Sequence, residues 1–168
     1  MDIVIREVKN DAVEIENVTA FLYDQIKKTY GIGPTPKFHY DIESMDEYYI
    51  LPERNNMYIA LDGEKIIATG AIRAYDVDYE ILRGMYSQKD TASIWRLMVD
   101  ENYRRMGIAR RLVNAMEEFA RDKDYEKIYL HTHRYLESGL PFWKSAGFEI
   151  TIEEDDYDET THMVKNLF

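Results

Sequence analysis

The sequence contains no cysteine among its 168 residues. A chain without thiols forms no disulfide, offers no thiolate to a metal ion and has no cysteine nucleophile. Any reaction that passes through a cysteine-bound intermediate is therefore excluded.

Long apolar runs are also missing, because no stretch approaches the length of a membrane-spanning helix. The first residues, MDIVIREVKNDAVEIE, lack the basic and apolar regions of a secretory signal peptide. Both observations predict a cytoplasmic protein without a membrane partner. The length suits a single domain, which we expect over residues 1–168.

Positive charge is scarce, since 21 Lys and Arg face 32 Asp and Glu, a net charge of −11. This balance argues against a nucleic-acid partner, because phosphate contacts need a basic face. The charges are unevenly spread: arginines gather at 104–111, whereas residues 153–159 read EEDDYDE. This acidic run either attracts a cationic partner or forms a solvated hairpin tip that keeps the protein soluble.

The local patterns predict a domain of mixed helices and strands. Helices are expected at 11–29, around 42–50, at 107–122 and near 138–146. Strands are expected at 3–8, 57–61, 65–75, 93–99, 127–133, 148–152 and 161–167. Asp62-Gly63, between two alternating runs, indicates a hairpin. Residues 76–92 are polar and are expected to be irregular.

The most informative segment is SIWRLMVDENYRRMGIA, residues 93–109. An apolar strand ends at Val99, and Arg104-x-x-Gly107-x-Ala109 stands at the start of a helix. A helix start leaves backbone N–H groups without partners and carries partial positive charge, and small residues let a bulky anion approach them. The segment fits a pyrophosphate cradle, or an ordinary strand and helix with a basic, solvated turn. The phosphate-loop and dinucleotide motifs, G-x-x-x-x-G-K-[ST] and G-x-G-x-x-G, do not occur.

A second strand at 127–133 and the segment PFWKSAGF at 141–148 follow this turn. In this order, residues 93–150 resemble the GCN5-related N-acetyltransferase (GNAT) superfamily. The resemblance implies an α/β (α+β) fold, with a mixed, mostly antiparallel sheet and helices on both faces. It also implies that acetyl-CoA is the cosubstrate. The pantetheine arm would pair with the strand, and the pyrophosphate would bind the amides of the turn. The cofactor-binding residues it implies are Leu97, Met98, Val99, Arg104, Arg105, Met106, Gly107, Ile108, Ala109 and Arg110, with Trp143 packed near the arm or in the core. Arg96 is left out, as a paired surface residue at a strand edge.

A proton acceptor matters to this chemistry, because an alkyl ammonium has a pKa near 10.4 and must lose a proton before it attacks. The resemblance places His131 where several family members carry a catalytic glutamate. Imidazole has an unperturbed pKa near 6.5 and suits the task, and His133 lies on the same face of the strand. The two histidines are therefore the catalytic candidates. They also fit ordinary strand residues, or an adventitious metal pair without an evident third ligand; no metal site is expected.

The chain departs from the family pattern at two positions. Trp143 stands where many members carry a tyrosine that protonates the departing thiolate, and Leu136 replaces an asparagine that contacts the pantetheine. An indole N–H is not a usable acid, so Tyr135 or His133 would have to replace it. These losses favour an alternative, a catalytically inactive acyl-CoA-binding sensor or interaction domain.

The resemblance places the acceptor pocket at about residues 24–50 and at the loop between the last two strands. Residues 24–50 are rich in aromatic and acidic side chains. This composition suits a small cationic molecule by cation–π and ion pairing, and equally a loop packed on the core. The predicted reaction is acetyl transfer from acetyl-CoA to a primary amine, of a small molecule or a peptide, by direct attack. A longer acyl chain or a hydroxyl acceptor stays open. Sheet edges near the C-terminus are available for pairing in a homodimer.

Overall fold

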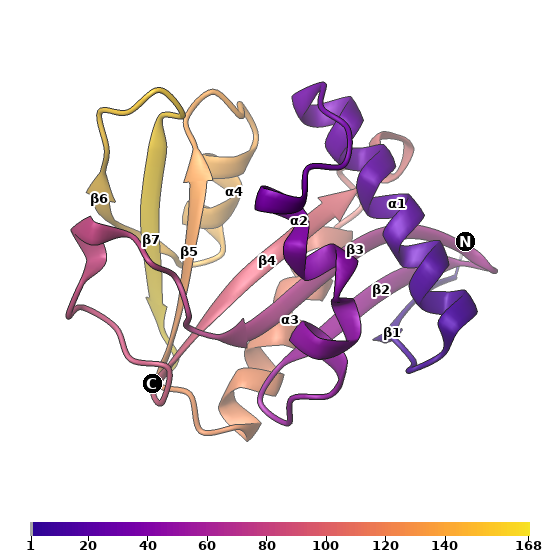
Figure 1. Ribbon diagram of the computed structural model, residues 1–168, viewed down its shortest axis with the longest axis horizontal. Coiled ribbons are helices and arrows are strands. Elements are labelled where there is room, and N and C mark those ends of the chain that lie inside the picture. Colours follow the sequence, from indigo (N-terminus) through magenta and orange to yellow (C-terminus); the bar gives the residue numbers. More distant parts are fainter. Residues whose placement is uncertain (1) are drawn as a thin grey trace. The chain divides into compact units, whose positions relative to one another are not determined.

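The computed structural model describes residues 2–168 (Figure 1). Its helices are α1 (Ala12–Tyr30), α2 (Pro36–Glu43), α3 (Ile108–Asp122) and α4 (Gly139–Ser145), with a π-helical turn at Asp46–Ile50 and 3₁₀ turns at Glu80–Leu82 and Glu101–Tyr103. Its strands are β1 (Ile3–Glu7), β2 (Asn56–Asp62), β3 (Lys65–Ala74), β4 (Thr91–Val99), β5 (Lys127–His133), β6 (Glu149–Glu153) and β7 (Thr160–Asn166). No helix of these residues is both long and apolar enough to cross a membrane.

The strands form one mixed sheet in the order β1-β2-β3-β4-β5-β7-β6. The pairs β1–β2, β2–β3, β5–β7 and β6–β7 are antiparallel, whereas β4 and β5 are parallel. The parallel register runs from Thr91 opposite Lys127 to Ser93 opposite Tyr129. The predicted fold class, a mixed and mostly antiparallel sheet with helices, is therefore confirmed.

The chain divides into two compact units, which are described separately. The first consists of Met1–Arg73 and Trp95–Met116, and the second of Ala74–Ile94 and Glu117–Phe168.

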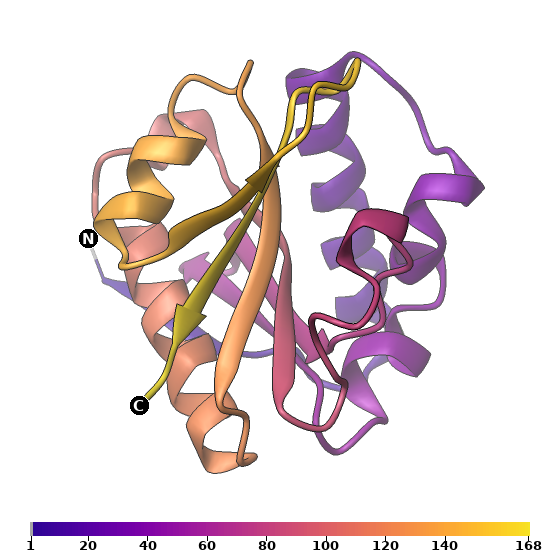
Figure 2. The ribbon, with the colours of Figure 1, turned by 90° about the vertical axis from the view of Figure 1, so that its left-hand side faces the viewer.

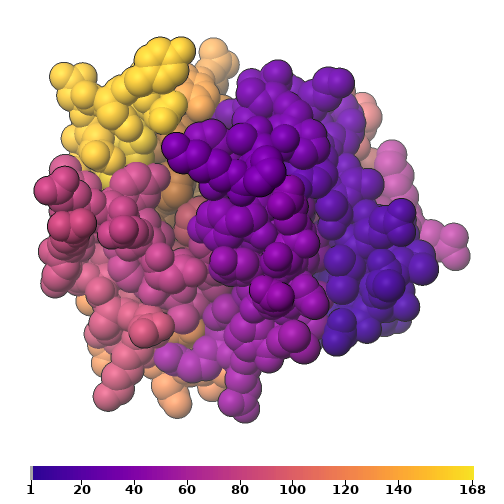
Figure 3. All heavy atoms as spheres, in the orientation of Figure 1, coloured from indigo at the N-terminus to yellow at the C-terminus, as the bar shows by residue number. Residues whose placement is uncertain are grey.

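The first unit is built around α1 and the β2–β3 hairpin. Asp11 caps the start of α1 by accepting the N–H of Glu14 at 3.0 Å, and Gly31 ends the helix in the left-handed conformation. The apolar stripe of this helix packs with residues of the hairpin and of the π-helical turn. The fully buried members of this core include Val18, Leu22, Ile26, Tyr49, Met57, Ile59 and Ala71. Atoms of the α1–α2 segment cover this face of the unit (Figure 3).

The opposite face of β3 receives the start of α3. Ala71 points into the core under α1, so its neighbour Gly70 points the other way. A methyl group at Gly70 would come within 2.9 Å of Cε of Met116, so only glycine lets α3 lie this close. Within this unit, helices therefore cover both faces of the strands. The apolar side chains Ile108, Leu112, Val113 and Met116 of α3 are buried.

One predicted element begins in the wrong place. The sequence indicates a short helix around 42–50, whereas α2 begins at Pro36 and a π-helical turn follows at Asp46–Ile50. Proline at the first helical position is favoured, because its missing N–H has no partner there and its φ already suits a helix. Thr35 and Pro36 therefore form the start of α2.

In the second unit, β5, β7 and β6 lie side by side (Figure 2). Trp143 of α4 packs edge-on against Phe142 and Phe148, with ring centres 5.0 and 5.2 Å away. The segment expected to be irregular, 76–92, contains a 3₁₀ turn whose Leu82 is buried, and β4 begins two residues before the predicted Ser93.

Candidate functional site

The strand that leads to the predicted cofactor site changes its backbone in the middle. Arg96 of β4 adopts a left-handed conformation with φ 53°. Its carbonyl oxygen accepts a hydrogen bond from Oγ1 of Thr69 at 2.7 Å. A left-handed residue interrupts the pleat of a strand. The half-buried residues Leu97, Met98 and Val99 therefore follow a local irregularity of the strand.

Arg96 is paired, as the sequence suggests, but its side chain is largely buried rather than at the surface, so the predicted surface position is wrong. Its Nε and Nη2 donate to the two carboxylate oxygens of Asp41 at 3.0 and 2.7 Å. The carboxylate is 1% exposed and the Arg96 side chain 15%. The left-handed backbone takes Arg96 out of the alternation of the strand, so position alone does not tell where its side chain goes.

Arg73 completes a buried charge cluster with Asp41 and Arg96. Its guanidinium lies 4.1 Å from the ring centre of Trp95, and its Nη1 donates to the hydroxyl of Tyr49 at 2.8 Å. Burial alone would raise the pKa of Asp41, but hydrogen bonds and charge from Arg96 outweigh burial and hold this pKa below its ordinary value. Part of the aromatic segment at 24–50 is therefore core.

The turn after β4 is attached to the β2–β3 hairpin. The N–H of Asp100 donates to the carbonyl of Ile67 at 2.8 Å, and the hydroxyl of Tyr103 donates to Asp62 at 2.7 Å. The carboxylate of Asp100 accepts the N–H of Asn102 and caps the 3₁₀ turn. These bonds hold the turn in one shape before the helix begins.

Two left-handed residues, Arg105 with φ 63° and Gly107 with φ 77°, lead into α3. The N–H of Arg111 donates to the carbonyl of Gly107 at 3.1 Å and so closes the first turn of the helix. Helix geometry leaves the N–H groups of residues 108 and 109 without intrahelical partners. A methyl group at Gly107 would meet no heavy atom within 4 Å, so the space beside these amides is open. This cradle fits a pyrophosphate.

The predicted cofactor residues of the turn lie together, mostly at the surface. Arg104, Arg105, Met106 and Gly107 are exposed, Ala109 and Arg110 are half-buried, and the Ile108 side chain is buried. Nη2 of Arg111 donates to the carbonyl of Ile3 at 3.0 Å, while Nε of Arg104 donates to that of Val99. The turn is thus anchored by apolar and backbone contacts and carries positive charge outside.

The two candidate catalytic histidines lie on β5 in the second unit. Both are half-buried, with ring centres 5.8 Å apart. Tyr79 packs edge-on against His131 at 5.6 Å. His133 stacks on Tyr135, and its Nδ1 lies 2.8 Å from the carbonyl oxygen of Asp158. A carbonyl only accepts, so Nδ1 of His133 carries the hydrogen and Nε2 is the acceptor of the neutral ring.

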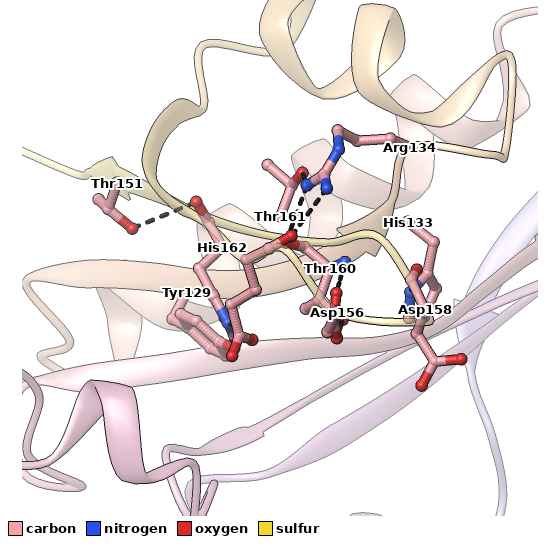
Figure 4. A network of polar contacts seen from close by, with 10 residues as sticks. Tyr129, His133, Arg134, Thr151, Asp156, Asp158, Thr160, Thr161 and His162 are labelled. Carbon is pink, nitrogen blue, oxygen red and sulfur yellow. Dashed lines mark hydrogen bonds and ion pairs between the residues drawn. The ribbon is translucent and has the colours of Figure 1, made fainter.

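A third histidine, His162 of β7, joins this group and was not among the predicted residues. It is the cross-strand partner of His131 and is fully buried. Its Nδ1 lies 2.7 Å from the hydroxyl of Tyr129 (Figure 4). Its Nε2 lies 2.7 Å from a carboxylate oxygen of Glu154. Alternation along the last strand gave no signal for His162, because residues 160–163 are all buried. Its position opposite His131 depends on the register of β5 and β7, which the sequence does not specify.

The acidic run forms an ordered hairpin between β6 and β7 (Figure 4). The carboxylate of Asp156 accepts the N–H and the hydroxyl of Thr160, each at 2.7 Å. Arg134 donates to the carbonyls of Glu154 and Thr160. Glu154 and Asp156 therefore have internal partners, while the side chains of Asp155 and Asp158 are exposed.

Trp143 is 8% exposed and forms part of the core of its unit. Its contact with a cofactor stays a prediction. Within residues 2–168, no three His, Asp or Glu side chains gather in a way that could hold a metal ion.

A sequence profile of the Acetyltransferase (GNAT) family matches residues 20–148. Human N-acetyltransferase 8 is 31% identical over 111 residues, which cover 66% of this chain and 46% of that protein. The chain thus spans about half the length of the curated relatives it matches.

Solved structures show the same fold. A GNAT-family acetyltransferase from Staphylococcus aureus Mu50 superposes with a TM-score of 0.79 at 18% identity, over 99% of this chain and 100% of that one. The PaiA N-acetyltransferase from Thermoplasma acidophilum, in complex with coenzyme A, superposes with a TM-score of 0.68 at 20% identity, over 99% of both chains. Together with the profile, these similarities show that the chain belongs to the acetyltransferase (GNAT) family.

Proposed function

We propose that this protein transfers the acetyl group of acetyl-CoA to a primary amine. The observation that carries the proposal is the open, left-handed turn at Gly107 where α3 begins. Backbone amides of Arg105 to Arg110 would hold the pyrophosphate, and the polar backbone of Leu97, Met98 and Val99 would pair with the pantetheine arm. The coenzyme in the related PaiA structure supports this assignment.

The reaction begins with the removal of a proton from the acceptor. Because pH 7 lies about 3.4 units below the pKa of an alkyl ammonium, forming the neutral amine costs roughly 4.6 kcal/mol. His131 is the proposed proton acceptor, directly or through a water, with His133 beside it. The nitrogen then attacks the thioester carbonyl carbon, the C–N bond forms, and the C–S bond breaks with its electron pair on sulfur. The nitrogen loses its second proton to the thiolate or to water, which leaves a neutral amide.

The departing thiolate needs little help from the protein. A thiol pKa near 8.5 makes thiolate a tolerable leaving group at neutral pH. This matters because Trp143 supplies no acid and lies in the core. His133 or Tyr135 would donate a proton if one is needed.

The acceptor is proposed to be a small cationic molecule or a peptide amine. The exposed carboxylates of the β6–β7 hairpin support it, because they lower the potential at that surface. We further propose that residues 1–168 act as one cytoplasmic domain. A homodimer, if formed, would use β6, which lies at the edge of the sheet.

A second candidate is an acyl-CoA-binding sensor without transferase activity. Two specific observations favour it: Trp143 and Leu136 stand where many family members carry the acid and a pantetheine-binding asparagine. Binding of acetyl-CoA is common to both candidates, but turnover is not.

The test is release of free thiol from acetyl-CoA across a panel of primary amines, with matched alcohols as controls. Thiol release with an amine, accompanied by its acetylated product, is the expected result. Binding of acetyl-CoA without release by any amine would contradict the transferase and favour the sensor.

A further inference from the structure

A buried hydrogen-bond chain crosses the sheet of the second unit, from the acidic hairpin to β5. Glu154 follows β6. His162 lies on β7 and Tyr129 lies on β5 (Figure 4). The two bonds of His162, to the Glu154 carboxylate and to the Tyr129 hydroxyl, are each 2.7 Å long. His162 and Tyr129 are both 0% exposed, so both nitrogens of the His162 ring form their hydrogen bonds inside the protein.

The chemistry of the three groups gives the chain a direction. An ionised carboxylate only accepts, so Nε2 of His162 carries a hydrogen and donates it to Glu154. In the neutral ring Nδ1 is then an acceptor, and the Tyr129 hydroxyl must donate to it. Burial raises the pKa of Tyr129 well above its ordinary value, so this hydroxyl keeps its proton.

The rings of this chain are also the neighbours of His131. His162 faces His131 across the β5–β7 ladder, and Tyr79 packs edge-on against both rings at 5.1 and 5.6 Å. The Tyr129 ring stacks on that of His162 with 22° between their planes. A change in the orientation of His162 would therefore reach His131 through Tyr79 and Tyr129.

We propose that Glu154 and His162 are positioning residues for His131. Glu154 selects one tautomer of His162, which fixes the Tyr129 hydroxyl, and the resulting aromatic wall holds the His131 ring in one orientation. A proton acceptor must stay within hydrogen-bond reach of the group it deprotonates, so a fixed ring benefits the reaction. This inference rests on the proposed role of His131, and it separates Glu154 from the solvated carboxylates of the hairpin.

The variant that tests it is Glu154→Ala, and the matched control is Glu153→Ala. Both remove one carboxylate from neighbouring positions, but Glu153 is exposed and lies outside the chain. We expect Glu154→Ala to lower kcat about tenfold, the range of coupling within one hydrogen-bond network, with the KM for acetyl-CoA unchanged. Glu153→Ala should retain the kcat of the unaltered protein.

The spectroscopic readout is the tautomer of His162, from ¹⁵N chemical shifts of the labelled protein. We expect Nε2–H in the unaltered protein and in Glu153→Ala, and loss of this preference in Glu154→Ala. Nδ1–H or a doubly protonated ring in the unaltered protein would overturn the proposed direction of the chain.

A double variant keeps the proposal falsifiable if single changes also lower stability. Tyr129→Phe removes the hydroxyl at the far end, so its loss of kcat should not add to that of Glu154→Ala. Additive losses would contradict one shared chain. His131→Ala is measured alongside: if it is fully active, the proton acceptor itself is wrong. If it is impaired while Glu154→Ala matches Glu153→Ala, only the positioning role fails.

Discussion

Arg96 illustrates what residue patterns in a sequence leave open. A strand residue flanked by apolar neighbours indicates a surface arginine, whereas its guanidinium holds the buried carboxylate of Asp41, 55 positions away. Such a pair cannot be predicted from local sequence, because the residues around each partner do not indicate the other. His162 was missed for the same reason, although its strand was predicted correctly.

The buried cluster predicts a strong dependence of stability on Asp41. Asp41→Asn leaves the guanidinium groups of Arg73 and Arg96 without their shared carboxylate, and breaking a buried ion pair costs about 3–5 kcal/mol. The free energy of unfolding in urea should fall by that amount. Asp24→Asn, in the exposed pair with Lys28, is the control and should change little. A small effect at Asp41 would show that the cluster adds little to stability.

The same carboxylate predicts a pH dependence. Its pKa is lower in the folded protein than in an unfolded chain, so its contribution is present above the unfolded pKa and is lost as pH falls through the folded value. Over that acid range, the free energy of unfolding of the unaltered protein should fall more steeply than that of Asp41→Asn. Parallel pH curves for the two proteins would contradict the assignment.

His131 predicts a characteristic kinetic profile. A histidine that removes the amine proton matters most where free amine is rare, so His131→Ala should lower kcat/KM roughly 100-fold at neutral pH and less at alkaline pH. The measurement is the pH dependence of thiol release with one primary amine. A loss of equal size at every pH would argue against a proton acceptor.

At the scale of elements, the strand, turn and helix of the cradle were predictable, whereas α2 was not. The first carries strong local signals, an apolar run that ends at Val99 and a glycine before a periodic helix. The second begins at a proline in a segment that also reads as a loop, and its π-helical turn has no sequence signature. Tertiary packing of Ile42 and Tyr49 decides that region.

The cradle predicts that Gly107→Glu abolishes binding of acetyl-CoA. The carboxylate would occupy the open space beside the amides and repel a pyrophosphate. Gly63→Glu is a matched control, because Gly63 is also left-handed, with φ 63°, and also has open space around it, in the β2–β3 turn. Calorimetric titration should show binding in the control alone. Unchanged affinity in Gly107→Glu would remove the pyrophosphate assignment.

The acidic hairpin predicts an effect on the acceptor rather than on the cofactor. Replacing the exposed loop residues Asp155, Asp158 and Glu159 by their amides should raise the KM of a cationic amine a few-fold, with the difference lost at high salt. Neutralising Glu118, Asp122 and Asp124, also in the second unit, is the control for net charge. If the two sets change the KM of the amine equally, the hairpin has no specific role in acceptor binding and serves only to keep the protein soluble.

At the scale of the whole molecule, the fold class was predictable because almost every strand and helix carries its own periodicity. The mixed sheet and the family were read from residues 93–150, and both are confirmed. The pairing of the strands was harder to predict. The order β5-β7-β6 and the register that places His162 opposite His131 depend on contacts between distant segments. The roles of the individual site residues remain proposals.

The most direct test of the central claim is calorimetric titration of the protein with acetyl-CoA, with primary amines then added to the same sample. The account predicts saturable binding, followed by release of free thiol when a suitable amine is present. Absence of binding heat, together with an unchanged Tm in acetyl-CoA, would contradict the cofactor site on which every proposed step depends.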